Sequence, residues 1–316
     1  MSSALCARCR RRDAVFMRAY SGEKLCARCF CKSIEGKVRA TIARHDMFKP
    51  TDKIMVAVSG GKDSLSLLRI LAKIEKAFPK TSLCAVTVDE GIKGYRDEAL
   101  KFAVGNCRKL GINSVVTSFK HLYGFSLDEI VKMTLEKEES GKGLTPCAYC
   151  GVLRRRALNL AARNAGVDKL ATGHNLDDET QTILLNILHG DVLRIARVKP
   201  VLEDVHPKFV QRVKPMCKLP EKEIALYAHY KRIEYQSVPC PYAPTALRSD
   251  VRLMLNRMEE KHAGTKFTLN KSIERIRPAL EAVTEEAKLQ DCLECGEPTA
   301  GKICQPCQML RKLGIH

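Results

Sequence analysis

The middle of the chain alternates short apolar runs with longer segments in which apolar residues recur every three or four positions. Residues 53–58 form a compact apolar run of strand type, and the residues that follow, up to Leu71, have helical spacing. The same alternation predicts strands at 53–58, 83–88, 113–118 and 168–172 and helices at 63–77, 95–110, 126–139, 149–165 and 177–189. This order is typical of an α/β fold with a doubly wound parallel sheet and right-handed crossovers.

The segments around this core differ from it in composition. Residues 190–247 are rich in Pro and β-branched residues, and we interpret them as an irregular connection. Residues 248–285 have the pattern of one or two basic, amphipathic helices, and both ends are short and rich in cysteine. We therefore divide the chain into an N-terminal module (1–33), a central domain (34–247), a basic helical segment (248–285) and a C-terminal module (286–316).

The turn after the first predicted strand has the composition of a phosphate-binding loop. It is Ser-Gly-Gly-Lys-Asp-Ser, residues 59–64. Two glycines let backbone N–H groups approach an anion, the hydroxyls add donors, and the helix N-terminus carries a partial positive charge. The loop lacks the spacing of a Walker motif. Ser-Gly-Gly alone could be an ordinary turn, but the six residues together favour a nucleotide site.

Polar side chains also follow two other predicted strands. Residues 173–179, Gly-His-Asn-Leu-Asp-Asp-Glu, open a helix after strand 168–172, and Asp89 ends strand 83–88 at a turn that could line an adenine pocket. The carboxyl ends of parallel strands share the sheet edge where α/β proteins bind ligands. Asp177 or Asp178 could hold Mg²⁺ or orient a nucleotide, and either could instead cap the helix. With Gly-His-Asn ahead of the pair, we favour the functional interpretation.

Composition indicates a polyanionic partner. The 316 residues include 54 Lys and Arg against 36 Asp and Glu, a formal net charge of +18. Nucleic acid is the leading candidate; an evenly basic, solvated surface is the alternative, and the cluster of arginines at 154–156 argues against it. Because only 5% of residues are aromatic and none is Trp, phosphate contacts and shape should matter more than base stacking.

The 15 cysteines are better explained as metal ligands or catalytic thiols than as disulfide partners. No apolar run approaches the roughly 20 residues of a membrane helix, and the N-terminus lacks a signal-peptide core, so we expect a cytoplasmic protein with no membrane partner.

Each end of the chain carries two Cys-x-x-Cys pairs, which supply the four thiolates of a closed tetrahedral zinc site. The pairs are Cys6, Cys9, Cys26 and Cys29 at one end and Cys292, Cys295, Cys304 and Cys307 at the other. These short segments could not fold on cores of their own, so we expect two Zn²⁺ ions to order them. Reduced, unliganded cysteines are the alternative.

A third group of cysteines lies in the central domain. Cys147 and Cys150 form a Cys-x-x-Cys pair ahead of a basic helix that begins near Gly151, and Cys240 stands between two prolines in an extended loop. Three thiolates can hold three irons of a four-iron cluster and leave the fourth iron open. A dithiol or persulfide relay on Cys147 and Cys150 and a purely structural role are the alternatives.

Together these motifs resemble the tRNA 2-thiouridine synthetase family of the cytosolic and archaeal type. The resemblance rests on residues 6–29, 59–64, 146–156, 173–179, 239–241 and 292–307, and zinc pairs at both ends separate this family from the tRNA 2-thiocytidine synthetases. It implies an adenine nucleotide α-hydrolase-like fold with a pyrophosphate loop, and makes residues 34–247 the catalytic domain. It also implies a [4Fe-4S] cluster on Cys147, Cys150 and Cys240, and a homodimer.

The resemblance further implies an adenylating sulfurtransferase that uses ATP and Mg²⁺. ATP would activate the C2 oxygen of a tRNA uridine, and sulfur from a ubiquitin-like carrier with a C-terminal thiocarboxylate, or from free sulfide, would replace that oxygen. We favour wobble uridine 34; the T-loop uridine 54, 2-thiocytidine formation and a non-enzymatic tRNA-binding iron–sulfur scaffold are alternatives.

The expected site residues fall into two sets. We expect the catalytic residues to be Asp63, Asp178, Arg154, Cys147 and Cys150, with Arg154 in a charge-stabilising role. We expect the nucleotide to contact Ala57, Val58, Ser59, Gly60, Gly61, Lys62, Asp63, Ser64, Asp89, Gly173, His174 and Asp178.

Overall fold

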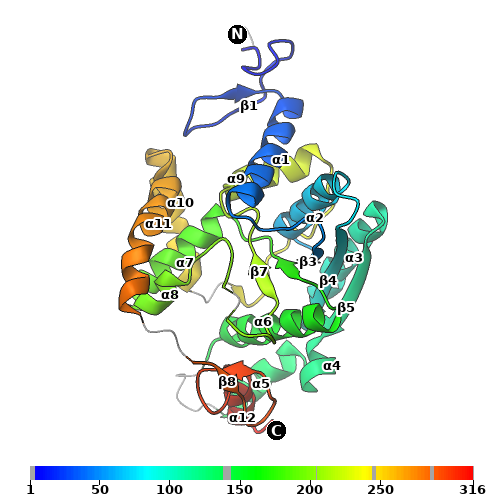
Figure 1. Cartoon of the computed structure of the whole chain (residues 1–316), viewed down its shortest axis with the longest axis vertical. Coiled ribbons are helices and arrows are strands. Elements are labelled where there is room, and N and C mark those ends of the chain that lie inside the picture. The colour runs from blue at the N-terminus through cyan, green and yellow to red at the C-terminus, as the bar shows by residue number, and fades with distance from the viewer. Residues whose placement is uncertain (1–3, 138–143, 204, 244–246, 285–287, 316) are drawn as a thin grey trace.

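The computed structural model describes residues 4–137, 144–203, 205–243, 247–284 and 288–315. At its centre lies a five-stranded sheet (Figure 1), formed by β3 (Lys53–Ala57), β4 (Ser82–Asp89), β5 (Asn113–Ser118), β6 (Lys169–Ala171) and β7 (Gln211–Val213). The strands are all parallel and lie in the order β5-β4-β3-β6-β7. The predicted α/β fold with a doubly wound parallel sheet is therefore confirmed.

The fifth strand lies in a segment that we expected to be irregular. Residues 190–247 contain α8 (Val192–Ala196), β7 and α9 (Glu221–Tyr230), so that expectation is wrong for much of the segment. β7 has three residues, too few for a period-2 pattern to be recognised. The short helix α4 (Phe119–Tyr123) escaped the sequence analysis for the same reason.

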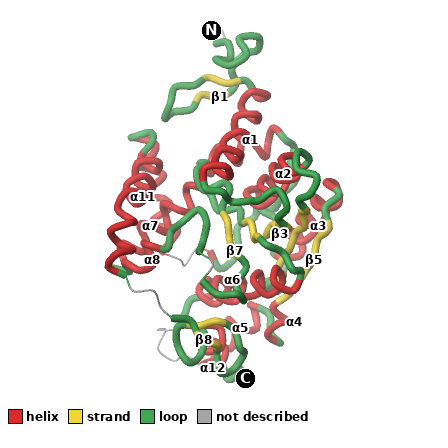
Figure 2. Tube along the Cα trace, viewed as in Figure 1, coloured by secondary structure: helices red, strands yellow, loops and turns green. Residues whose placement is uncertain are grey.

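Helices cover both faces of the sheet (Figure 2). Ile54 and Val56 of β3 point into a core shared with α1 (Ala27–Arg44), α2 (Lys62–Glu75), α3 (Arg96–Leu110) and α9. Met55, between them, points to the opposite face, where α6 (Pro146–Asn164) packs on the sheet, with α5 (Leu127–Lys137) beside it. This alternation is the direct result of the two-residue period of a strand.

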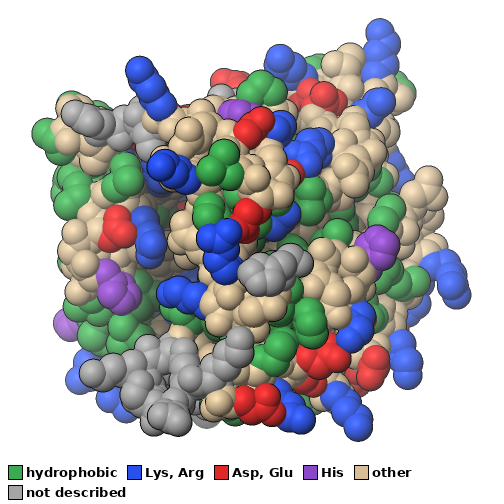
Figure 3. All heavy atoms as spheres, turned by 90° about the horizontal axis from the view of Figure 1, so that it is seen from below, with side chains coloured by type: hydrophobic (Ala, Val, Ile, Leu, Met, Phe, Trp, Pro, Cys, Tyr) green, Lys and Arg blue, Asp and Glu red, His purple; other side chains and the backbone are tan. Residues whose placement is uncertain are grey.

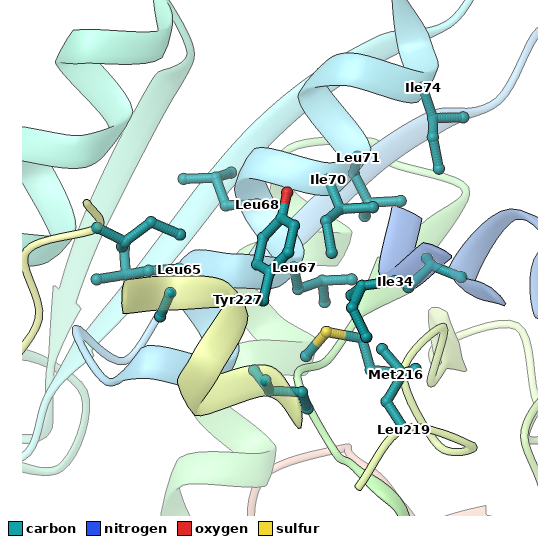
Figure 4. Close-up of a cluster of buried hydrophobic side chains, with 14 of the residues drawn as sticks. Ile34, Leu65, Leu67, Leu68, Ile70, Leu71, Ile74, Met216, Leu219 and Tyr227 are labelled. Carbon is teal, nitrogen blue, oxygen red and sulfur yellow. The ribbon is translucent and has the colours of Figure 1, made fainter. Parts of the chain in front are cut away.

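Helix α2 is central to the larger core. Its residues Leu67, Leu68 and Ile70 are completely buried, and Figure 4 shows the apolar side chains of α2 beside Tyr227 of α9 and Ile34 of α1. Burying a side chain of this size contributes roughly 1.5–3 kcal/mol. Because α2 begins at Lys62, within the phosphate-binding loop, this packing fixes the direction in which the loop enters the helix.

A helical lobe stands beside the sheet. It consists of α7 (Leu176–Leu188), α8, α10 (Leu247–Lys261) and α11 (Thr265–Val283), packed around Ile183 and Ile273. The expected helical segment at 248–285 is thus present as two helices. No described helix is both long enough and apolar enough to cross a membrane.

The two cysteine-rich modules lie at opposite ends of the molecule (Figure 1). The first contains β1 (Phe16–Met17), β2 (Lys24–Leu25) and the start of α1, and the second contains β8 (Gln290–Asp291), β9 (Pro298–Thr299) and α12 (Gln305–Lys312). α1 runs through residue 33, so the first module and the central domain share a helix. The division into four segments stays a prediction. The second module packs on α6, where Arg163 pairs with Glu297 at 2.6 Å.

Candidate active site

The phosphate-binding loop lies at the carboxyl edge of the sheet. Ala57 ends β3, and the N–H of Val58 still donates to β4. Within the loop, Ser64 Oγ accepts a hydrogen bond from the N–H of Ser59 at 3.1 Å and donates to the carbonyl of Gly61 at 3.0 Å. Gly61 is the N-cap of α2 and gives it no side-chain cap, so the first N–H groups of the helix are available to an anion.

Two glycines let the backbone segments of this site approach one another. Gly60 has a φ of +89°, and a Cβ there would lie 2.2 Å from the carbonyl oxygen of Ala99. Gly173 follows β6, and a Cβ there would lie 3.0 Å from the backbone nitrogen of Ser64. The two predicted motifs, 59–64 and 173–179, therefore meet as a single site.

Asp63, in the first turn of α2, is held from two sides. Its Oδ2 pairs with Lys62 Nζ at 3.0 Å, and its Oδ1 accepts from Asn175 Nδ2 at 3.2 Å. Lys62 also pairs with Glu221 Oε1 at 2.6 Å. Burial raises the pKa of Asp63 in spite of Lys62, so a cation arriving with a nucleotide would stabilise the charged carboxylate.

The structure separates the roles of the two neighbouring aspartates. Asp177 is buried, accepts the N–H of Glu221 at 2.7 Å and pairs with Lys266, so it joins α7 to α9 and α11. Asp178 forms a capping box with Asn175, in which each side chain accepts the backbone N–H of the other. Burial, and to a smaller extent the charge of Asp63, raises the pKa of Asp178 to about 6. Asp178 is thus a helix cap, and its other carboxylate oxygen lies 3.7 Å from Arg248 Nη2.

His174 and Asp89 border the same sheet edge. His174 Nδ1 lies 2.8 Å from Thr172 Oγ1. Desolvation by the surrounding protein and the charge of neighbouring cations, chiefly Lys214, lower the pKa of His174 to about 3, so its ring is neutral at pH 7. Asp89 accepts the N–H of Gly91 at 2.9 Å and so shapes the turn after β4.

An ion-pair network that the sequence analysis missed joins this site to α6; Glu90 and Arg96 are buried in it and Arg154 is partly exposed. Glu90 pairs with Arg96 Nε at 2.8 Å and with Arg154 Nη1 at 3.3 Å. Arg96 also donates to the carbonyl of Ser59 at 2.6 Å and to that of Val88. The only signal in the sequence was the position of Glu90 in the turn after a strand.

The paired central cysteines lie in the first two turns of α6. The helix begins at Pro146, so the expected start near residue 149, after Cys147, is wrong. Thr145 is the N-cap and accepts the N–H of Ala148 at 3.3 Å, and Pro is well suited to the first helical position. Cys147 and Cys150 therefore stand about one turn apart near a positively polarised helix end, but burial outweighs that polarity and raises the pKa of both thiols.

Cys240 joins this pair from a distant part of the chain. Cys147 Sγ lies 3.5 Å from the carbonyl oxygen of Tyr242, and Cys150 and Cys240 pack against the same apolar cluster. Burial raises the pKa of Cys150 to about 11, opposed by the nearby charge of Arg154. Bound iron or another cation would be needed to hold this thiol as a thiolate at neutral pH.

The terminal cysteines form two compact groups. In each group, all four sulfur atoms lie within 4.8 Å of one another, as a single metal ion requires. Within the described ranges, no other set of three or more His, Cys, Asp or Glu side chains meets that limit. The central cysteines fall outside it, which suits ligands of separate irons in a cluster better than ligands of one ion.

Basic side chains are spread over the surface near the second module. Figure 3 shows Lys and Arg side chains on this face, with Asp and Glu side chains among them. The face in view therefore has no broad, unbroken basic patch.

Comparison with known proteins gives a consistent result. Residues 32–259 match the PP-loop domain family. A solved structure, the U34-tRNA thiolase NcsA from Methanococcus maripaludis with its [4Fe-4S] cluster, is 36% identical, superposes with a TM-score of 0.85, and is matched over 100% of this chain and 98% of that one. The tRNA 2-thiolation protein NcsA of Haloferax volcanii is 36% identical over 96% of this chain and 97% of its own length. The cytoplasmic tRNA 2-thiolation protein 1 of Aspergillus niger is 33% identical over 99% and 89%.

Proposed function

Since this chain belongs to the PP-loop family of tRNA 2-thiolation proteins, we propose that it is an ATP-dependent tRNA thiolation enzyme that converts uridine to 2-thiouridine. We assign its target as uridine 34, the position in the name of the Methanococcus maripaludis thiolase, and its compartment as the cytoplasm, as in the name of the Aspergillus niger relative. The observation that carries the proposal is that a nucleotide site and a candidate cluster site are joined in one structure. Arg96, Glu90 and Arg154 connect the phosphate-binding loop to the helix that carries two of the three central cysteines. We call these cysteines, Cys147, Cys150 and Cys240, the cysteine triad.

The first half of the reaction activates the base. The C2 oxygen of uridine attacks the α-phosphorus of ATP, and pyrophosphate leaves. The N–H groups at the start of α2 and the ammonium group of Lys62 stabilise the charge on pyrophosphate. Asp63 and Asp178 would hold Mg²⁺, since burial raises the pKa of both carboxyl groups and a bound Mg²⁺ ion would favour their charged forms.

The second half replaces the activated oxygen. Sulfide attacks C2, the bond between C2 and the adenylated oxygen breaks, and AMP leaves with that oxygen. Cys147, Cys150 and Cys240 would hold the [4Fe-4S] cluster, which when bound supplies an iron with an open position for sulfide. Arg154, one turn beyond Cys150 on α6, places a positive charge beside the thiolates and limits the repulsion among them.

Two further assignments concern partners. The sulfur donor is a ubiquitin-like protein with a C-terminal thiocarboxylate, or free sulfide, and the exposed position of Cys147 makes the triad accessible to either. The chain acts as a homodimer, and exposed apolar residues on the helical lobe, such as Leu188 and Met254, suit a subunit contact. Sedimentation of the purified protein would measure its mass in solution.

Separating the two half-reactions tests the proposal. Asp63→Ala should abolish tRNA-dependent formation of AMP from radiolabelled ATP. Cys240→Ala should lose the cluster absorption and the thiolated product but retain AMP formation, because its loop is separate from the phosphate-binding loop. Cys84→Ser, which removes a half-buried cysteine of β4, is the matched control and should keep both activities. AMP formation by Asp63→Ala at the wild-type rate would show that the nucleotide site lies elsewhere.

A further inference from the structure

The three consecutive arginines of α6 have three different environments. Arg154 pairs with Glu90. Arg156 directs Nη1 toward Cys307 Sγ at 3.8 Å, against the second cysteine module. Arg155 has no ion pair or hydrogen bond from its side chain to any residue of the described ranges.

Arg155 stands next to Arg212, which likewise has no counter-ion among the described residues. On β7, Val210 packs against the α6 side of the sheet and Val213 against the other, so Arg212 points to the side of α6. Asn159 of α6 accepts the N–H of Val210 at 3.0 Å. Arg155, one helical turn before Asn159, therefore lies beside Arg212, two residues further along the strand.

Arg155 is exposed and its charge is solvated, whereas Arg212 is half-buried and has the positive charge of Arg155 beside it. Burial and the charge of Arg155 lower the pKa of Arg212 to about 10. Arg212 Nε is buried, and no acceptor in the part of the chain that the structure describes receives its hydrogen bond. Two other arginines act on Arg155: Arg154 is paired with Glu90 at 3.3 Å and Arg194 with Asp191 at 3.1 Å. Arg155 and Arg212, with no acceptor for the Arg212 Nε–H, thus offer a site for an anion from outside the protein.

The pair lies next to the proposed reaction site. The carbonyl of Val213, the residue after Arg212, accepts the N–H of Thr172 at 3.0 Å, and Thr172 Oγ1 lies 2.8 Å from His174 Nδ1, in the motif that packs against the phosphate-binding loop. We propose that Arg155 and Arg212 together bind a backbone phosphate of the substrate RNA beside the uridine that reacts. This inference rests on the proposed function and adds to it a contact that positions the nucleotide. Guanidinium groups suit the task because each can donate two parallel hydrogen bonds to phosphate.

RNA binding at several salt concentrations tests the inference. The metal-loaded full chain is titrated into a fluorescent anticodon stem-loop RNA, as wild type, Arg155→Gln, Arg212→Gln and the double variant. The double variant should bind the RNA at least about tenfold more weakly than the wild type. Its slope of log affinity against log salt concentration should be shallower by about 0.7, the change expected when one phosphate contact in a single-stranded loop is lost. Arg108→Gln, which removes an exposed arginine from the last turn of α3, is the control and should change affinity less than about twofold.

A neutral phosphate analogue identifies the contact. Single methylphosphonate linkages are placed in turn on either side of the target uridine. One of them should weaken binding to the wild type by about tenfold and have no further effect on the double variant. Arg155→Lys, which keeps the charge, should recover part of the affinity and excludes misfolding as the cause.

Two results would overturn the inference. One is wild-type RNA affinity in the double variant; a raised KM for ATP in that variant would then assign the site to a nucleotide phosphate. The other is a loss at every methylphosphonate linkage that simply adds to the loss caused by the double variant. If the wild type shows the coupling but makes no 2-thiouridine, the proposed function fails while this phosphate site stands.

Discussion

Replacing Glu90 with Gln should damage both halves of the active site at once. The Glu90 side chain is 4% exposed and lies 2.8 Å from Arg96 Nε and 3.3 Å from Arg154 Nη1. Removing one partner of a buried ion pair costs about 3–5 kcal/mol because the remaining charge is uncompensated. Gln keeps the shape and one acceptor, so we expect the lower end, about 3 kcal/mol, in the free energy of unfolding. Arg96 also fixes the carbonyl of Ser59, so the rate of AMP formation should fall as well.

Chemical denaturation and AMP formation measure the two effects in the same preparation. Glu234→Gln is the matched control, because Glu234 pairs with Lys109 on the surface, where the side chains are 63% and 65% exposed. Exposed pairs of this kind contribute about 0–1 kcal/mol. If Glu90→Gln were no less stable and no slower than Glu234→Gln, the network would not support the site, and our account of how the loop is joined to α6 would be wrong.

Two further predictions concern stability and metal content. Burial raises the pKa of Glu75 to about 7, and its Oε1 has no partner among the described residues, so ionising it should lower the stability of the wild type progressively from about pH 4.5 to 7. Glu75→Gln should lack this decrease and be more stable than the wild type by about 1–2 kcal/mol at pH 8, after allowance for the partial exposure of Glu75. Urea unfolding at several pH values measures the difference. If the stability of wild type and variant changed equally with pH, the raised pKa of Glu75 would be wrong. Cys6→Ser and Cys304→Ser should each lower zinc from two ions to one per chain by elemental analysis and reduce stability, and two ions in either variant would refute the four-thiolate sites.

The sequence was most informative where function imposes residue types. The loop at 59–64, the motif at 173–179 and the terminal cysteine pairs could all be found from spacing alone, because backbone approach to phosphate requires glycine and a metal requires several thiolates. The two motifs do meet, as the contact between Gly173 and Ser64 shows.

The parts that the sequence did not reveal depend on tertiary contacts. Neither the pairing of Glu90 with Arg96 and Arg154 nor the separation of Asp177 from Asp178 can be read from spacing, because the partners come from different elements. β7 was missed because three residues carry too little periodicity, and Arg212 with it. The start of α6 was placed too late because Pro146 resembles a helix boundary, although proline fits the first turn.

The central claim is that this chain converts the C2 oxygen of uridine 34 to sulfur. The most direct test is to incubate the anaerobically loaded protein with unmodified tRNA, ATP, Mg²⁺ and sulfide, and to map the modified nucleoside by mass spectrometry of tRNA fragments. We predict 2-thiouridine at position 34 that depends on ATP and is absent with Cys240→Ala. Thiolation at another position, thiolation without ATP, or undiminished thiolation by Cys240→Ala would contradict the account.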